Sequence, residues 1–566
     1  MTEARPVESP AIAPADAGGG RAGRFARIVP IVVVLAVLAV RSVYWAALEG
    51  SALSDWHRWT ETDEYSNLEW SARIAGGSWL DAPAYRGWAS WQGAYGTQEA
   101  WDGWYQRNVY FQGVLYTYFL AAVRRAAGFP VVPVRLLQLL LASVTAGVVA
   151  AAVRAVLVRA RSRVRGLSGW GVAVGPLAAG LSYGLFSPLV FHDGFLLRDG
   201  PFAHLSALLV ALALMAEAPR PRSLVLLGLL GGATALLKQT GLPLALLAVA
   251  VVAAKGEKGR RTLLAATGVA ALLLPLGCLF ARNVAVGAPT FAFDTRGQVC
   301  LAWSCARGAN GTNTPSPLLG TILSRAGGST GSVVRQVAES WRGDLAGLAG
   351  LELRKAATFF HRYEIADNAN FSFFRDRLPV LAFLPVFACL LGPGLVGLGS
   401  ASANRLLSAG EAALVWGGFL FPFASCLLVS TTSRYRAAVA GPLAIGLGLG
   451  LAALLTLGAD RAGLRRAAPA VALAVLVSLV PLLPPVVPTP RATYSDALVA
   501  ATLAEARGSG EAGAIEIGRY LREGTDDPLR PVGILAAQAW LAGERAHAQV
   551  EAGSVAPPGK RFRLPR

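Results

Sequence analysis

The sequence contains few charged residues. Lys, Arg, Asp and Glu together make up 15% of its 566 residues, whereas hydrophobic residues make up 54%. A soluble globular domain usually has about 25% charged residues. This shortage excludes an ordinary soluble globular protein, so most of the chain is expected to have lipid as its solvent.

Acidic residues are scarcer than basic ones, and cysteines are few. The 34 acidic and 52 basic residues give a net charge of +18, but the basic residues form short clusters between apolar runs. A nucleic-acid-binding face would instead be continuous. The five cysteines show no CxxC spacing, which argues against a zinc ribbon or a thioredoxin-type site. Only Cys300 and Cys305 are close together, and we expect them to form a disulfide on the oxidising side of a membrane.

Apolar runs long enough to cross a hydrocarbon core of about 30 Å recur along the chain. The run at 224–254 is ambiguous, because it could be one long span or two short spans broken at Lys238. Basic loops favour the cytoplasmic side. Four basic clusters lie between the apolar runs, at 159–165, 220–222, 255–261 and 461–466. All four fall on the cytoplasmic side only if the run at 224–254 is two spans. We therefore predict eleven spans, with a cytoplasmic N-terminus and an external C-terminus, at 28–48, 136–158, 170–190, 201–216, 224–254 (two), 263–279, 378–399, 412–430, 437–457 and 467–487.

The predicted fold class is an all-α polytopic membrane protein. Its first apolar run is too long for a signal-peptide core, so we interpret it as an uncleaved span. The segment 111–127 carries two arginines and is predicted to be an external juxtamembrane helix. The domain prediction is a disordered cytoplasmic N-terminus (1–27), a membrane domain (28–487) with external loops at 49–133 and 282–377, and an external helical tail (488–566).

The first external loop is rich in tryptophan. Eight of the fourteen tryptophans lie between Trp56 and Trp104, more than an interfacial belt would supply. The loop could lie on the lipid headgroups, or it could be a lid whose rings stack on sugar or lipid. The two interpretations are compatible, so both stay open.

Acidic candidates occur in two places outside the predicted spans. Asp63 and Glu64 follow the first span and could act as a general base, as a metal ligand or simply as a solvated turn. Asp193 and Asp199 lie between the third and fourth spans, together with His192 and Arg198. Ionisable groups next to a span are costly and indicate a functional site, although Arg198 could instead pair with either aspartate and only fix the turn.

Basic candidates lie near the same predicted surface. Lys238 falls between two spans too short to cross the bilayer alone, so we expect it in a protein-lined recess, where a lipid phosphate would be a natural partner. Arg434 and Arg436 could form a second phosphate clamp or could snorkel to the interface. A divalent metal could be bound by external residues, although no spacing among them requires one: His57, His192, His361 and Glu364.

The order of these motifs resembles the GT-C membrane glycosyltransferases, especially the bacterial relatives of protein O-mannosyltransferase and aminoarabinose transferase. Each motif is weak alone, but together they extend over nearly the whole membrane region. The resemblance is carried by Asp63-Glu64-Tyr65, Ala72-Arg73, Gly76-Gly77, 191–201, 228–233, Leu237-Lys238-Gln239-Thr240, Ala281-Arg282-Asn283, Tyr363-Glu364-Ile365, 367–371 and Ser433-Arg434-Tyr435-Arg436.

The resemblance implies a GT-C-like bundle and a hexosyl- or pentosyltransferase in the bacterial plasma membrane. The donor would be a polyprenyl-phosphate-linked sugar, and the acceptor a lipid, glycan or protein on the outer face. Carried over by position, Asp63 is the catalytic base with Glu64 beside it, and Asp193 or Asp199 is the second acidic site. The phosphate would be held by Lys238 and Arg436, with no certain cofactor.

One segment departs from the pattern of these enzymes. The stretch 110–116 reads Tyr-Phe-Gln-Gly-Val-Leu-Tyr, so the acceptor side is expected to differ from the better-known members. Two other classes remain open. A transporter or lipid flippase would show internal symmetry between its halves and charges near the bilayer midplane. A non-catalytic scaffold for envelope assembly would not need Asp63.

Overall fold

A computed structural model describes residues 21–81, 103–104, 106, 108–161, 167, 169–457 and 461–543. Within these ranges all regular structure is helical, which confirms the predicted all-α class. Among the described helices, seven are long and apolar enough to cross a membrane. Their main segments are α1 (Arg21–Glu49), α6 (Val131–Ala160), α12 (Arg261–Ala285), α18 (Phe387–Ala403), α19 (Ala409–Leu428), α21 (Ala440–Leu457) and α22 (Arg461–Leu479).

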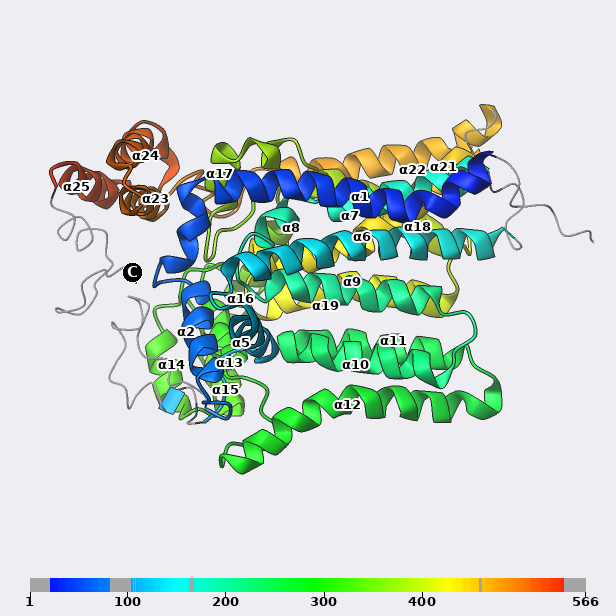
Figure 1. Ribbon diagram of the computed structural model, residues 1–566, viewed down its shortest axis with the longest axis horizontal. Coiled ribbons are helices and arrows are strands. Elements are labelled where there is room, and N and C mark those ends of the chain that lie inside the picture. The colour runs from blue at the N-terminus through cyan, green and yellow to red at the C-terminus, as the bar shows by residue number, and fades with distance from the viewer. Residues whose placement is uncertain are drawn as a thin grey trace, which may run out of the picture.

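Four shorter apolar helices lie among these long ones, and the bundle runs along the long axis of the molecule (Figure 1). Each of the four has 13 to 17 residues. Counting them as spans would give the predicted eleven, a number that stays a prediction. They are α7 (Gly169–Gly184), α9 (Asp199–Met215), α10 (Pro221–Leu237) and α11 (Leu242–Ala254).

The break predicted at Lys238 is confirmed. Helix α10 ends at Leu237, the short 3₁₀ turn η2 (Gln239–Gly241) follows, and α11 begins at Leu242. Pro243 explains where α11 begins, because a proline in the first helical turn needs no hydrogen-bond partner for its nitrogen. At 1.5 Å per residue, α10 and α11 are roughly 25 and 20 Å long, shorter than the hydrocarbon core.

Glycines allow α10 to pack closely on α12. A Cβ atom at Gly228 would lie 2.2 Å from the carbonyl oxygen of Gly268, and one at Gly232 would lie 2.6 Å from that of Leu272. Small residues at such positions let helix backbones approach within a membrane. The glycine motif at 228–233 therefore has a packing role, because it lets α10 contact α12 along their backbones.

Several boundaries differ from the predictions. Helix α1 begins at Arg21, so residues 21–27 are helical and only 1–20 of the predicted disordered segment lie outside the described residues. The third predicted span is interrupted, because α7 ends at Gly184 and a separate helix α8 (Ser187–His192) begins with Pro188 in its first turn. The span predicted at 378–399 agrees with the apolar segment 379–403, but this segment starts with the short turn η4 (Pro379–Ala382), and its α-helix begins only at Phe387.

One end of the bundle carries the remaining helices, at the left of Figure 1. The segment predicted as a juxtamembrane helix forms α5, which lies across this end and is seen almost end-on. The tail, described as far as residue 543, forms three helices there, in agreement with the predicted helical tail. The helices of this end are η1 (Ala52–Arg58), α2 (Asp63–Ala75), α5 (Leu115–Ala127), α13 (Arg296–Cys305), α14 (Leu319–Ala326), α15 (Thr330–Ser340), α16 (Leu345–Phe360), α17 (Phe371–Arg377), α23 (Tyr494–Ala506), α24 (Gly510–Glu523) and α25 (Arg530–Leu541).

Part of the tryptophan-rich loop, residues 82–102, lies outside the described residues, and three of its eight tryptophans lie there. Trp56, Trp70 and Trp104 are buried in the packing of this end, whereas Trp79 is about half exposed. At least three of the eight tryptophans therefore stabilise the fold, and the lid interpretation stays a prediction for the rest.

The charge pattern and the break in α10 and α11 together predict the topology. Reporters fused after Arg165 and after Arg261 should read cytoplasmic, whereas fusions after Ala100, Gly311 and Gly524 should read external. An external signal at Arg261 would contradict the two-span interpretation of 224–254.

Candidate functional site

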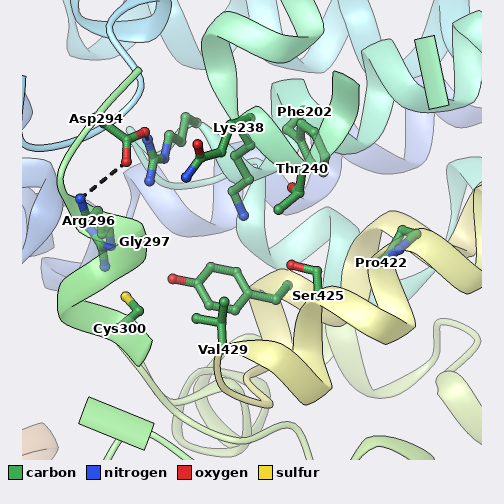
Figure 2. A pocket seen from close by; sticks show the side chains of 13 residues that line it. Phe202, Lys238, Thr240, Asp294, Arg296, Gly297, Cys300, Pro422, Ser425 and Val429 are labelled. Atoms are coloured by element: carbon green, nitrogen blue, oxygen red, sulfur yellow. Dashed lines mark hydrogen bonds and ion pairs between the residues drawn. The ribbon is translucent and has the colours of Figure 1, made fainter. Parts of the chain in front are cut away.

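A cavity of about 90 Å³ opens where the break after α10 faces helices α13 and α19. Figure 2 shows Lys238 reaching into it opposite Arg296, Gly297 and Cys300 of α13. Each buried water needs about 10–15 Å³, so the cavity has room for several waters or a small anion. Its lining residues are Arg198, Phe202, Lys238, Gln239, Thr240, Asp294, Arg296, Gly297, Cys300, Pro422, Ser425, Val429 and Tyr435.

Lys238 lies in the recess that the sequence predicts. Its side chain is 10% exposed, and its Nζ forms an ion pair with Asp199 at the start of α9. The same nitrogen lies 4.2 Å from the centre of the Tyr435 ring and 5.2 Å from that of Phe202. A carboxylate and two aromatic faces thus stabilise the ammonium group, and its other side remains open to the cavity.

Arg198 is the cavity cation with the weakest compensation. Its Nη1 lies 3.9 Å from Asp294 Oδ2, a long distance for an ion pair, and this buried nitrogen makes no hydrogen bond within the described part of the chain. A Cβ atom at Gly113 would lie 2.7 Å from this nitrogen, so the absence of a side chain there leaves room for the guanidinium group. The sequence also allowed Arg198 to pair with Asp193 or Asp199. Neither ion pair forms among the described residues.

Arg296 joins the cavity to Asp63. Its Nη1 donates to both carboxylate oxygens of Asp63, each at 3.0 Å, and to the side-chain oxygen of Gln112 at 3.1 Å. Arg296 begins α13, and its backbone nitrogen donates to Asp294 Oδ1 at 3.2 Å. Asp63 itself does not line the cavity, so Arg296 is its link to whatever binds there.

Asp63 is held on three sides. Besides Arg296, it binds Arg434 Nη1 at 2.7 Å, and the Asn368 side chain bonds both its backbone nitrogen and its carboxylate. Burial alone would raise the pKa of Asp63, but the two guanidinium groups outweigh it and hold the pKa below its ordinary value. Asp63 is therefore ionised at neutral pH and only weakly basic while both arginines contact it.

Arg434 lies inside this network and not at a free phosphate site. Its guanidinium group contacts Asp63, lies 3.6 Å from Asp199 and binds Asp367 at 2.6 Å. Three carboxylates already surround it, which explains how a 4% exposed arginine is tolerated. In this structure Arg434 fixes Asp63 and Asp199, and its phosphate role stays a prediction.

Arg436 also differs from its predicted role. It binds Glu364 at 2.5 Å, donates to the carbonyl oxygen of Phe359 at 2.8 Å and stacks on the Phe387 ring at 4.2 Å. Arg436 and Glu364 are 3% and 2% exposed, and neither lines the cavity. These contacts fix the segment after α16 and leave Arg436 outside the cavity, so its phosphate role stays a prediction without support from this geometry.

The two candidates for the second acidic site occupy different environments. Asp199 contacts Lys238 and lies near Arg434. Asp193 instead pairs with Arg41 of α1 and with His204 Nε2 at 3.0 Å, inside the helix bundle. The structure thus places Asp199, and not Asp193, next to Lys238 and Arg434. The catalytic role of either aspartate stays a prediction.

Glu64 is separated from this cluster, although it adjoins Asp63 in sequence. It is fully buried, and its Oε1 accepts a hydrogen bond from the Leu196 backbone at 2.6 Å. Burial raises the pKa of Glu64 to about 7. Its contact with Leu196 indicates that Glu64 anchors α2 to the loop before α9.

The candidate metal ligands are not brought together. His192 bonds Ser433 at 2.8 Å, His361 bonds the backbone of Tyr363, and Glu364 pairs with Arg436. Among the described residues, no group of three or more histidine, cysteine or acidic side chains is arranged to hold a metal ion.

The predicted disulfide is wrong in this structure, where both thiols are free. Cys300 and Cys305 belong to one helix, α13, and are five residues apart. That separation is roughly 7.5 Å along a helix axis, beyond the 4.4–6.8 Å usual between disulfide-linked Cα atoms. Cys300 lines the cavity, whereas Cys305 is buried 3.0 Å from Lys355 Nζ.

Three residues of the site were not predicted from the sequence. Asp294 and Arg296 lie in the segment 282–377, where a lone acid and a lone base form no motif, and only the fold brings them to Lys238. Tyr435 belongs to the motif at 433–436, but the sequence assigns it no role. Its ring contact with Lys238 depends on the turn after α19.

No protein-family model, curated protein or solved structure matches the chain. The resemblance to GT-C enzymes therefore depends on the motifs alone, and the function is argued from the geometry described above.

The reassignment of Arg436 predicts a stability defect. Arg436→Met would leave Glu364 buried without its cation, which typically costs ~3–5 kcal/mol. We expect a clearly lower midpoint for heat-induced aggregation in detergent, whereas Arg362→Met, at an exposed position of the same segment, should change it little. A stable Arg436→Met protein that had lost only donor binding would restore the phosphate role.

Proposed function

We propose that the protein is a glycosyltransferase that moves a sugar from a polyprenyl-phosphate donor to an acceptor on the outer face of a bacterial plasma membrane. The observation that carries the proposal is the placement of one carboxylate, Asp63, behind a cavity lined by three cations. These are Arg198, Lys238 and Arg296, and Arg296 contacts Asp63 directly.

The cavity has the charge and size expected of a phosphate site. Arg198 Nη1 makes no hydrogen bond to any described residue, and Lys238 is paired with Asp199 on one side. Gly297 brings the N-terminal end of α13 to the cavity wall, and such ends attract anions. The apolar lining by Phe202, Pro422 and Val429 would suit the first carbons of a lipid chain.

The chemistry requires a base and a stabilised leaving group. The acceptor hydroxyl oxygen attacks C1 of the sugar, the bond from C1 to the phosphate oxygen breaks, and the phosphate keeps the electron pair. Asp63 takes the hydroxyl proton, while Arg198 and Lys238 stabilise the charge that develops on the phosphate. A single displacement of this kind inverts the anomeric centre.

Arg296 would couple donor binding to the base. Without donor, its guanidinium group holds Asp63 ionised and weakly basic. A phosphate in the cavity competes for Arg296, so the pKa of Asp63 rises towards its ordinary value when the donor binds. The carboxylate would thus become a better base only in the complex.

The alternative from another class is a transporter or lipid flippase. The observation in its favour is the buried group formed by Arg41, Asp193 and His204, because ionisable residues inside a bundle often mark a transport path. Transfer of label from a polyprenyl-phosphate sugar to a new product, without movement of intact donor, would separate the two functions.

The proposal predicts that two substitutions cause separable defects. Asp63→Asn keeps the shape but removes the base, so turnover should fall about 100-fold or more while donor binding survives. Lys238→Ala removes a phosphate contact and should weaken donor binding, by ~2–5 kcal/mol if the phosphate is left unpaired. Both are measured with labelled polyprenyl-phosphate sugars in purified protein.

Two exposed residues of the same types serve as controls. Glu69→Gln changes an exposed acid of α2, and Lys258→Ala changes an exposed lysine beyond α11, so both should behave as wild type. Full turnover in Asp63→Asn, or unchanged donor affinity in Lys238→Ala, would contradict the assigned roles.

A further inference from the structure

The C-terminal tail packs against the end of the bundle that holds Asp63. Its first helix, α23, shares a hydrophobic core with η1 and α17, and the fully buried Trp56 lies in that core. Two arginines attach the tail more widely, because Arg507 binds Asp55 at 2.7 Å and Arg377 pairs with Glu516. The buried apolar residues of this core include Leu53, Trp56, Phe371, Phe373, Phe374, Val499 and Leu503.

Asp496 connects the tail to the segment before α17. Its Oδ2 accepts hydrogen bonds from the Thr493 backbone at 2.9 Å and from the Thr493 hydroxyl at 2.8 Å, which caps α23. The same oxygen accepts a hydrogen bond from Asn370 Nδ2 at 3.1 Å. Asp496 and Asn370 are 5% and 1% exposed, so little water is available to replace this contact.

Asn370 fixes its own segment in both directions. Its Oδ1 accepts from the backbone nitrogen of Ser372 at 3.0 Å and so caps α17. Two residues earlier, Asn368 Oδ1 accepts from the Asp63 backbone at 2.6 Å and its Nδ2 donates to Asp63 Oδ2 at 3.1 Å. Asp367, in the same segment, binds Arg434. Residues 367–370 therefore link the tail to the carboxylate and to the arginine that orients it.

We propose that helix α23 positions the candidate base, with Asp496 acting on Asp63 through Asn370 and Asn368. This inference rests on the proposed function and gives the tail a part in it. Asp496 does not touch the cavity, so it is a positioning residue. A small misplacement of a reacting group lowers the rate strongly, so a weakened link should reduce turnover and leave donor affinity, which depends on Arg198 and Lys238, unchanged.

An exchange of donor and acceptor tests the link. In D496N a neutral amide oxygen replaces the charged carboxylate that accepts from Asn370, and bonds to charged acceptors are the stronger ones. In N370D two carboxylates face each other, so each single variant weakens the contact. The double variant N370D/D496N restores one donor and one acceptor and keeps an oxygen to cap α17. We expect turnover about tenfold lower in each single variant, donor affinity within about twofold of wild type, and recovery in the double variant.

Thr493→Ala is the matched control, because it loosens the cap of α23 but leaves the Asp496 carboxylate to Asn370. Turnover in this variant should stay near the wild-type value. An equal loss in Thr493→Ala, full turnover in D496N, or no recovery in the double variant would overturn the proposal.

Hydrogen exchange gives a readout that does not need transferase activity. Peptides covering 365–370 and the Asp63 backbone amide should exchange faster in D496N than in wild type and should regain protection in the double variant. Unchanged exchange at Asp63 would overturn the link. The wild type could transfer no sugar from any polyprenyl-phosphate donor while hydrogen exchange changed as expected in the variants. The proposed function would then fail, and the structural link from Asp496 to Asp63 would stand.

Discussion

The buried contact of Asp63 with Arg296 and Arg434 is the interaction on which the rest of the site depends. A carboxylate in so little water is stable only because two guanidinium groups offset its desolvation. Each arginine also has a second set of contacts. Arg296 lines the cavity, and Arg434 lies near Asp199 and binds Asp367. Substitutions at these positions are therefore expected to affect one another and not to add independently.

The bundle provides the geometry in which this network can work. The break between α10 and α11 releases Lys238 from a helix and lets it point into a protein-lined recess. Close packing at Gly228 and Gly113 brings α10 against α12 and against the segment before α5. The tail then packs through α23 against the end of the bundle that holds Asp63. Elements far apart in sequence thus contribute to one small volume.

Local patterns predicted much of the fold. Apolar runs and charge bias located the helices and the break at Lys238, because these follow from lipid solvation and from the bias of basic loops. Helix boundaries at Gly184 and Phe387 were missed, since they depend on prolines and on a tertiary hydrogen bond from Ser187 to Pro385. The predicted disulfide failed because the two cysteines fall in one continuous helix.

The site was only partly predictable for a physical reason. Asp63, Asp199 and Lys238 stand out in sequence because charges next to spans are costly. Arg434 and Arg436 are equally prominent, yet their partners, Asp63 for one and Glu364 for the other, are set by long-range packing. The position of Arg296 next to Asp63 joins residues 233 apart in sequence, so no local pattern could have indicated it.

The central claim is that the cavity between Lys238, Arg198 and Arg296 holds the phosphate of a lipid-linked sugar beside Asp63. The most direct measurement is a cryo-EM structure of the whole chain in nanodiscs with a polyprenyl monophosphate. The account predicts phosphate density within hydrogen-bond reach of Arg198 and Lys238, with Arg296 turned towards it and away from Asp63. Density at another site, or an empty cavity at saturating lipid, would contradict it.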